Sequence, residues 1–228
     1  MRRLLAWSLF AFLPLDSLSQ SPALVPAIGA LRLGDYVQAI ETLKPHAAKG
    51  DPEAEYLLGV AYATAPEGQR DLHAALEWYG KAAAQGHAGA LNNLGTMYYD
   101  GRGVERDFAE AARLYRAAAE KKHPEALYNL ALMNGMGIGM PPNEREMIRL
   151  LRPAADAGLP GAQAQLGLAY EKGLGVTRDL DAAHEWLLRA ARGGHKGAMR
   201  ELAAIYELGL GVPADEKAAA SWREQAAR

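Results

Sequence analysis

The stretch ALNNLGTMYYDGRGVERDFAEAARLYRAAAEKKHPE, residues 90–125, is one complete copy of a unit that recurs along most of the chain. Four further copies align with it at an interval of 36 residues, without insertion or deletion, and they begin at Ala54, Ala126, Ala162 and Ala198. A fixed period of this length is typical of a solenoid, in which each copy buries the apolar face of its neighbour. The sequence therefore predicts a stacked repeat protein.

Each copy is expected to contain two helices joined by a glycine-rich turn. Small or apolar residues at positions 90, 94, 95, 97 and 98 have the spacing of one face of a helix. Gly101 and Gly103 end this helix, because glycine readily adopts the left-handed conformation just past a helix end. Asp107 is then expected to cap a second helix. The unit is therefore a helical hairpin, and the fold class is all-α.

Two finer expectations concern contacts inside the repeat. One slot of the first helix accepts only small residues, which predicts that a neighbouring helix crosses closely there: Gly59, Gly95, Ala131, Gly167 and Ala203. Glu110 and Glu146 lie three residues beyond Asp107 and Asn143, which is the spacing of a capping box.

Residues 20–50 are interpreted as a degenerate N-terminal copy, and residues 51–228 as the five regular ones. In the first of these, Ala65-Pro66-Glu67-Gly68 replaces the usual turn, so a different tip geometry is expected there. In the third copy, Asn134 replaces the tyrosine of the pattern, and the turn sequence, residues 135–142, is also irregular.

Residues 1–19 have the pattern of a secretory signal peptide. Arg2 and Arg3 precede the apolar run at positions 4–15, and Ser17 and Ser19 supply small residues before an expected cut near Ser19–Gln20. The run is shorter than the roughly 20 residues that a spanning helix needs. The alternative is a buried N-terminal helix of the fold. We expect a periplasmic or secreted protein, with no membrane span in the mature chain.

Composition argues against several kinds of ligand. The formal net charge is −2, which gives no electrostatic reason to expect nucleic-acid binding, since that would require a clearly basic face. It has no cysteine, which excludes disulfides and thiolate metal sites. His87, His123 and His195 share one repeat slot, but neighbouring copies lie about 10 Å apart, too far for ligands of one zinc ion. No metal or cofactor is expected.

The motif A-x-x-x-L-G-x-x-Y, followed by G-x-G-V, Asp and A-x-x-W-Y-x-K-A-A, resembles the Sel1-like repeat family, a relative of the tetratricopeptide repeats. Ala90, Gly95 and Tyr98 carry the first part of the motif, and Trp78-Tyr79 carries the last. The resemblance implies a right-handed α-solenoid with the first helices on its concave face. It also implies a non-catalytic adaptor that binds a protein or peptide, in bacteria often at the cell envelope.

Two alternatives follow from the same resemblance. A few family members are described as β-lactamases or penicillin binders, and others act as structural scaffolds in envelope export assemblies. A penicillin-recognising site would need an S-x-x-K motif. After the signal peptide only Ser21 and Ser221 remain, and neither has a lysine three residues later. We therefore expect no enzyme activity and no catalytic residue.

The concave positions of the tetratricopeptide unit identify candidate partner-binding residues. Amides offer both a donor and an acceptor to a peptide backbone, and tyrosines add rigid amphipathic area. A merely solvated helix face is the alternative. The candidates are Tyr56, Leu57, Asn92, Asn93, Tyr99, Tyr128, Asn129, Gln165 and Glu171.

Two further features bear on binding. Met133, Met136 and Met140 in the third copy either fill gaps in the core or supply an accessory contact, since thioethers adapt to irregular surfaces. At the C-terminus no polar helix covers the last copy, so Ala218, Ala219 and Trp222 are expected to be partly bared and available for self-association.

Overall fold

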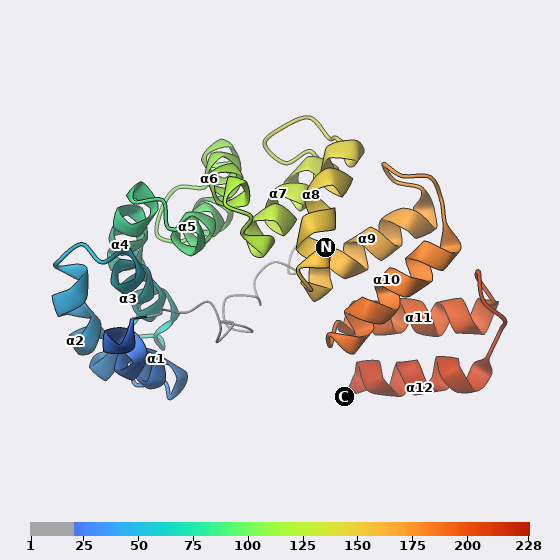
Figure 1. Cartoon of the computed structure of the whole chain (residues 1–228), viewed down its shortest axis with the longest axis horizontal. Coiled ribbons are helices and arrows are strands. Elements are labelled where there is room, and N and C mark those ends of the chain that lie inside the picture. Colours follow the sequence, from blue (N-terminus) through green and yellow to red (C-terminus); the bar gives the residue numbers. More distant parts are fainter. Residues whose placement is uncertain (1–20) are drawn as a thin grey trace. The chain divides into compact units, whose positions relative to one another are not determined.

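The computed structural model describes residues 21–228, which are helical throughout apart from their connections and contain no strand (Figure 1). The predicted signal peptide lies outside these residues. The chain divides into two compact units, one ending at Asp107 and the other beginning at Phe108. No helix among the described residues is long and apolar enough to cross a membrane.

The first unit, which we call the N-terminal unit, begins with a short 3-10 helix and continues with five α-helices. They are η1 (Pro22–Leu24), α1 (Val25–Arg32), α2 (Tyr36–Ala47), α3 (Pro52–Thr64), α4 (Leu72–Ala84) and α5 (Ala88–Asp100). Each α-helix packs against the next one along the chain, and α3 also touches α5.

The C-terminal unit contains seven α-helices packed in the same consecutive manner. They are α6 (Phe108–Glu120), α7 (Pro124–Met136), α8 (Glu144–Asp156), α9 (Pro160–Lys172), α10 (Leu180–Arg192), α11 (Lys196–Leu208) and α12 (Glu216–Ala227). Figure 1 shows the antiparallel hairpin clearly for α11 and α12. The predicted all-α, solenoid type of packing is confirmed.

The helix ends follow the predicted signals. Gly101, Gly137, Gly173 and Gly209 close the first helices in the left-handed conformation, with φ between 66° and 73°. Second helices are capped by a side-chain oxygen that accepts first-turn N–H groups, from Asp35, Asp71, Asn143, Asp179 and Asp215. The first regular copy differs as expected, since α3 ends at Thr64 and the residue that follows it, Ala65, is not left-handed.

The turn of the third copy is less irregular than its sequence indicates. Gly137 and Gly139 have φ values of 66° and 71°, close to those of Gly173 and Gly175. The third copy therefore keeps the usual turn geometry despite its irregular turn sequence. Two glycines in the left-handed conformation are enough to preserve the turn, whatever residues surround them.

The second glycine of the turn has no space for a Cβ atom, which the sequence pattern did not reveal. A Cβ atom on Gly103 would lie 2.8 Å from Leu72 Cβ, and one on Gly211 would lie 2.7 Å from Leu180 Cβ. Leu72 and Leu180 each begin the second helix of the preceding copy. The second glycine therefore brings one turn into contact with the neighbouring repeat.

The predicted close crossing at the small-residue slot is confirmed. A Cβ atom on Gly59 would overlap the ring of Tyr79, and one on Gly167 would lie 2.8 Å from Leu187 Cγ. Tyr79 and Leu187 belong to the second helix of the same hairpin. The first helix thus lacks a side chain where the second helix inserts a large one.

The predicted capping box at Asn143 is wrong in its reciprocal half. Asn143 accepts from the N–H of Glu146, but its own N–H donates to Asn134 O at 2.8 Å. The Glu146 carboxylate instead binds Arg149 through two hydrogen bonds of 2.6 and 2.7 Å. A charge-assisted bidentate pair is stronger than a bond to a neutral amide, so the arginine takes the carboxylate.

The expectation of a bared C-terminal face holds only in part. Ala219 is fully buried, which contradicts the prediction for this residue. Ala218 and Trp222 are half-buried, and Trp222 packs against the core cluster that includes Leu187 and Leu202. Self-association through α12 stays a prediction.

Candidate partner-binding surface

One face of the first helices α5, α7 and α9 is left partly uncovered by the helices that they pack on. On α9 this face carries Gln165, Leu168 and Lys172, which are half-buried or exposed, while Leu166, Gly167 and Ala169 beside them are buried. The spacing i, i+3, i+7 places the first three residues on one side of the helix. We call such a face a first-helix stripe, and each unit has its own. In the C-terminal unit Asn129, Leu132 and Met136 form the stripe of α7, and in the N-terminal unit Asn93, Thr96 and Asp100 form the stripe of α5.

Three of the predicted contact residues are not on the surface. Leu57 is fully buried, Asn92 is 8% exposed and Met133 is 1% exposed. Leu57 occupies the same slot as Asn93, but in α3 that slot belongs to the core cluster formed with α1 and α2. The prediction of direct partner contact is therefore wrong for these residues. Met133 fills the core, which was one of the two interpretations of the methionines.

Two predicted tyrosines lie in the seam between successive copies. A Cβ atom on Gly89 would lie 3.2 Å from the ring of Tyr56, and one on Gly161 would lie 3.2 Å from the ring of Tyr128. Tyr56 also stacks on His87, with ring centroids 4.5 Å apart. Each tyrosine thus rests on a glycine at the start of the next first helix. Packing accounts for much of their apolar area.

His87 links two copies through both of its ring nitrogens. Nδ1 accepts from the N–H of Ala90 at 3.1 Å and so caps α5. Because Nδ1 is an acceptor, the ring proton is on Nε2, which donates to Glu53 Oε2 at 3.0 Å. His87 is therefore neutral in this arrangement. His195 caps α11 in the same way, through Ala198 N–H at 3.0 Å.

Two of the three histidines in this slot thus cap a first helix, whereas the His123 side chain makes no cap hydrogen bond to α7 and its Nδ1 lies 3.3 Å from Glu125 Oε2. No group of three or more His, Cys, Asp or Glu side chains within residues 21–228 could hold a metal ion. Capping by histidine was not foreseen, because Ser, Thr, Asp and Asn are the residues usually found at this position. The recurrence of His just after a glycine turn would have been the available signal.

Acid should weaken the cap at His195. Burial lowers the pKa of this ring from its ordinary value, the bond to its own backbone opposes the shift, and nearby Arg200 reinforces it. A histidine with a lowered folded-state pKa binds protons more readily when unfolded, so its stabilisation is present above pH about 6.5 and is lost as pH falls through the folded pKa.

His195→Asn should therefore remove about 1 kcal/mol of the acid destabilisation, since asparagine caps at either pH. The measurement is the difference in urea midpoint between pH 8 and pH 5 for both proteins. His184, whose pKa burial also lowers, is common to both and cancels. Equal pH sensitivity of the two proteins would contradict a capping role for the neutral ring.

The Asn93 side chain is held by hydrogen bonds at both ends of its amide group. Its Nδ2 donates to the hydroxyl of Tyr79 at 3.2 Å, and its Oδ1 accepts from Asn92 Nδ2 at 3.3 Å. Tyr79 is 1% exposed, and burial raises the pKa of its hydroxyl well above the ordinary range. Asn92 is itself buried and donates a hydrogen bond to the Asn93 side chain.

The remaining candidates are half-buried, as a binding surface allows. They are Tyr99, Asn129, Gln165, Glu171 and Met140, while Met136 is exposed. Burial raises the pKa of the Tyr99 hydroxyl and of the neighbouring Asp100 carboxyl. Glu171 Oε2 is buried without a hydrogen-bond partner, and its backbone oxygen accepts from Arg178 Nε at 2.9 Å.

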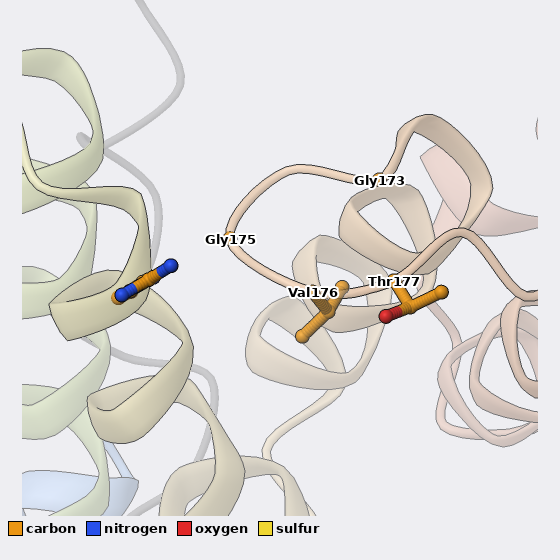
Figure 2. A pocket seen from close by; sticks show the side chains of 5 residues that line it. Gly173, Gly175, Val176 and Thr177 are labelled. Atoms are coloured by element: carbon orange, nitrogen blue, oxygen red, sulfur yellow. The ribbon is translucent and has the colours of Figure 1, made fainter.

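An open depression lies beside the turn between α9 and α10. Figure 2 shows Val176 and Thr177 on the loop that also contains Gly173 and Gly175, and Arg145 completes the lining. The lining holds one hydroxyl and one guanidinium, with no carboxylate or imidazole to act as a general base. The depression therefore gives no support to a catalytic site.

Stacked two-helix units with an outward stripe on the first helices define an α-solenoid repeat protein, a class that presents extended binding surfaces. The Sel1 repeat model matches residues 52–87, 88–123, 124–159, 160–195 and 197–228. The chain therefore belongs to the Sel1 repeat family, whose members are generally protein-interaction scaffolds.

Solved structures agree with this assignment. A Sel1 repeat protein from Oxalobacter formigenes is 33% identical, with a TM-score of 0.82 over 90% of this chain and 82% of that chain. A protective antigen of uropathogenic Escherichia coli is 37% identical, with a TM-score of 0.77 over 82% of this chain and 40% of that chain. An immunity protein from Pseudomonas aeruginosa is 27% identical, with a TM-score of 0.54 over 77% and 64%. Among curated proteins no significant match is found.

Proposed function

We propose that this chain is a non-catalytic adaptor of the bacterial cell envelope, or a secreted one, and that each unit binds an extended segment of a protein partner on its own first-helix stripes. The family supplies the general role of a protein-interaction scaffold. The similar proteins named above include an antigen and an immunity protein, which is compatible with action at or beyond the envelope.

One observation carries the choice of surface. Asn93, Asn129 and Gln165 occupy the same slot on α5, α7 and α9, and all three are half-buried on the outward face. A carboxamide offers a donor and an acceptor in one plane, which matches the N–H and C=O groups of an extended backbone. On α7 and α9, Leu132 and Leu168 follow the carboxamide along the stripe. These leucines provide apolar contact area for the partner's side chains.

The carboxamide slot can be tested with a selected peptide in place of the natural partner. A linear peptide selected from a random library against the full chain serves as the probe, and fluorescence polarisation gives its Kd. The double variant Asn93→Ala, Asn129→Ala should weaken binding about fivefold, because whichever unit holds the probe loses a hydrogen bond worth about 1 kcal/mol. Helicity should be unchanged.

The matched control is Gln38→Ala, which removes an exposed carboxamide from the second helix α2. Its Kd should equal that of the unmodified chain. If the Asn double variant and the Gln38 variant bind the probe equally well, the stripe is not the binding surface.

Export is tested separately. Expressed in Escherichia coli, the full chain should be recovered from the periplasm with the intact mass of a chain that begins at Gln20. Ser19→Lys should retain the full mass, because signal peptidase requires a small residue just before the cut. Recovery of the unmodified chain at full mass from the cytosol would contradict the proposed localisation.

A further inference from the structure

We infer that Tyr79 is a positioning residue, which holds the Asn93 carboxamide in one fixed orientation so that it can bind the backbone of an extended peptide. The inference rests on the proposed function, since it concerns the same surface. It assigns a binding role to a residue that is itself buried and touches no ligand.

The hydrogen bonds fix which end of the amide faces the protein core. Asn93 Nδ2 donates to the Tyr79 hydroxyl at 3.2 Å, while Oδ1 accepts from Asn92 Nδ2 at 3.3 Å. Both ends of the amide are thus held, and neither flip nor rotation is possible without losing a bond. One N–H and one oxygen lone pair of Asn93 are left for a ligand. Together they suit an uncharged, extended backbone.

The tyrosine ring cannot move to release this bond. Tyr79 is 1% exposed, and the ring lies directly over Gly59 on α3, where even a Cβ atom would overlap it. Tyr56 lies on another side, with ring centroids 6.1 Å apart. The hydroxyl is therefore delivered to Asn93 from a rigid position in the core.

Packing alone does not require a hydroxyl at this place. The equivalent slots on α8 and α10 hold Leu151 and Leu187, both fully buried. Burial of a phenol costs free energy unless its oxygen is hydrogen-bonded, and burial accordingly raises the pKa of Tyr79. A leucine would fill the space without that cost. The presence of a hydroxyl at this position is therefore explained by its hydrogen bond to the Asn93 side chain.

The residue types along the repeat follow the same rule. Tyr115 stands 36 residues after Tyr79, is 3% exposed, and is paired in the pattern with Asn129. Leu151 and Leu187, in the tyrosine slot of the third and fourth copies, are instead followed by Gln165 and Glu201 in the asparagine slot of the next copy. Tyrosine thus occurs where the shorter asparagine side chain is present. By the same argument Tyr115 positions Asn129.

The test uses Tyr79→Phe in the full chain, with the library-selected peptide as probe. Loss of the hydroxyl should weaken binding about fivefold, as expected for one hydrogen bond of about 1 kcal/mol. The melting temperature should fall by no more than a few degrees, since the ring still fills the core. Tyr62→Phe, which removes a hydroxyl from α3 in the same unit, should leave the Kd unchanged.

A double-mutant cycle separates positioning from general stability. In an Asn93→Ala background, Tyr79→Phe should have no further effect on the Kd. An equal fivefold loss in that background would overturn the inference, as would an unchanged Kd for Tyr79→Phe alone while Asn93→Ala weakens binding. If Asn93→Ala itself leaves the Kd unchanged, the proposed binding surface is contradicted, and not only the positioning role of Tyr79.

A measurement without any ligand covers the case in which Tyr79→Phe folds poorly. In the unmodified chain one of the two Asn93 side-chain amide protons should exchange with solvent more slowly in NMR experiments than the amide protons of the exposed Gln69, because it is hydrogen-bonded to the Tyr79 hydroxyl. Exchange of both Asn93 amide protons as fast as those of Gln69 would show that the amide is not held and would overturn the inference.

Discussion

Alanine at Gly175 is expected to lower the free energy of unfolding by about 3–4 kcal/mol. Gly175 has a φ of 68°, which costs a residue with a Cβ atom about 1–2 kcal/mol. The added Cβ would also overlap the carbonyl oxygen of Glu144 at the start of α8, and a backbone atom cannot move aside as a flexible side chain can. Overpacking of this kind costs about 1–3 kcal/mol.

Gly194→Ala is the matched control in the same unit. Gly194 has a φ of 85°, but nothing lies within 4 Å of its missing Cβ. It should therefore lose only about 1–2 kcal/mol from the strained conformation. Urea unfolding followed by circular dichroism compares the two variants. An equal decrease in the free energy of unfolding for both variants would mean that the turn at Gly175 is not in close contact with the preceding repeat.

The second large effect is expected at Gly59 in the N-terminal unit. Gly59→Ala would place a Cβ atom within the ring of Tyr79, which α4 holds in the core. In a helix alanine is normally favoured over glycine by about 1 kcal/mol. The clash should outweigh this gain and leave a net loss of about 2–3 kcal/mol.

The same substitution in the same hairpin should have the opposite sign at Gly80. This residue lies inside α4, and nothing is found within 4 Å of its missing Cβ. Gly80→Ala should therefore stabilise the chain by about 0.5–1 kcal/mol. Thermal unfolding of the two variants checks the pair. A stabilising effect at both positions would contradict the close crossing of α3 and α4.

Much of the architecture could be predicted because the same local signals for helix ends and turns recur in successive copies of the repeat. Asp71 and Asp179 cap second helices, and Gly101 and Gly173 close first helices, for reasons that involve only adjacent residues. The capping box failed at Glu146 because Arg149, one turn further along the helix, competes for the carboxylate. The competition depends on the strengths of the two bonds, which spacing alone does not reveal.

The candidate surface was predicted less well. Asn93, Asn129 and Gln165 lie on the outward stripe, but Asn92 and Leu57 are buried beside it. Adjacent residues on a helix point about 100° apart, so a transfer of positions from a related repeat can be wrong by one residue and select the core. The role of Tyr79 could not be found this way, because its partner Asn93 lies on another helix.

The sequence by itself determined the hairpin unit, its 36-residue period, its caps and its turns, because each depends on interactions within a few residues. Only the tertiary structure decided which side of each first helix is free, which tyrosines rest on glycines of the next copy, and which buried hydroxyl holds an amide in place. These features depend on how successive copies are stacked. A repeat pattern gives the order of that stacking but not the distances within it.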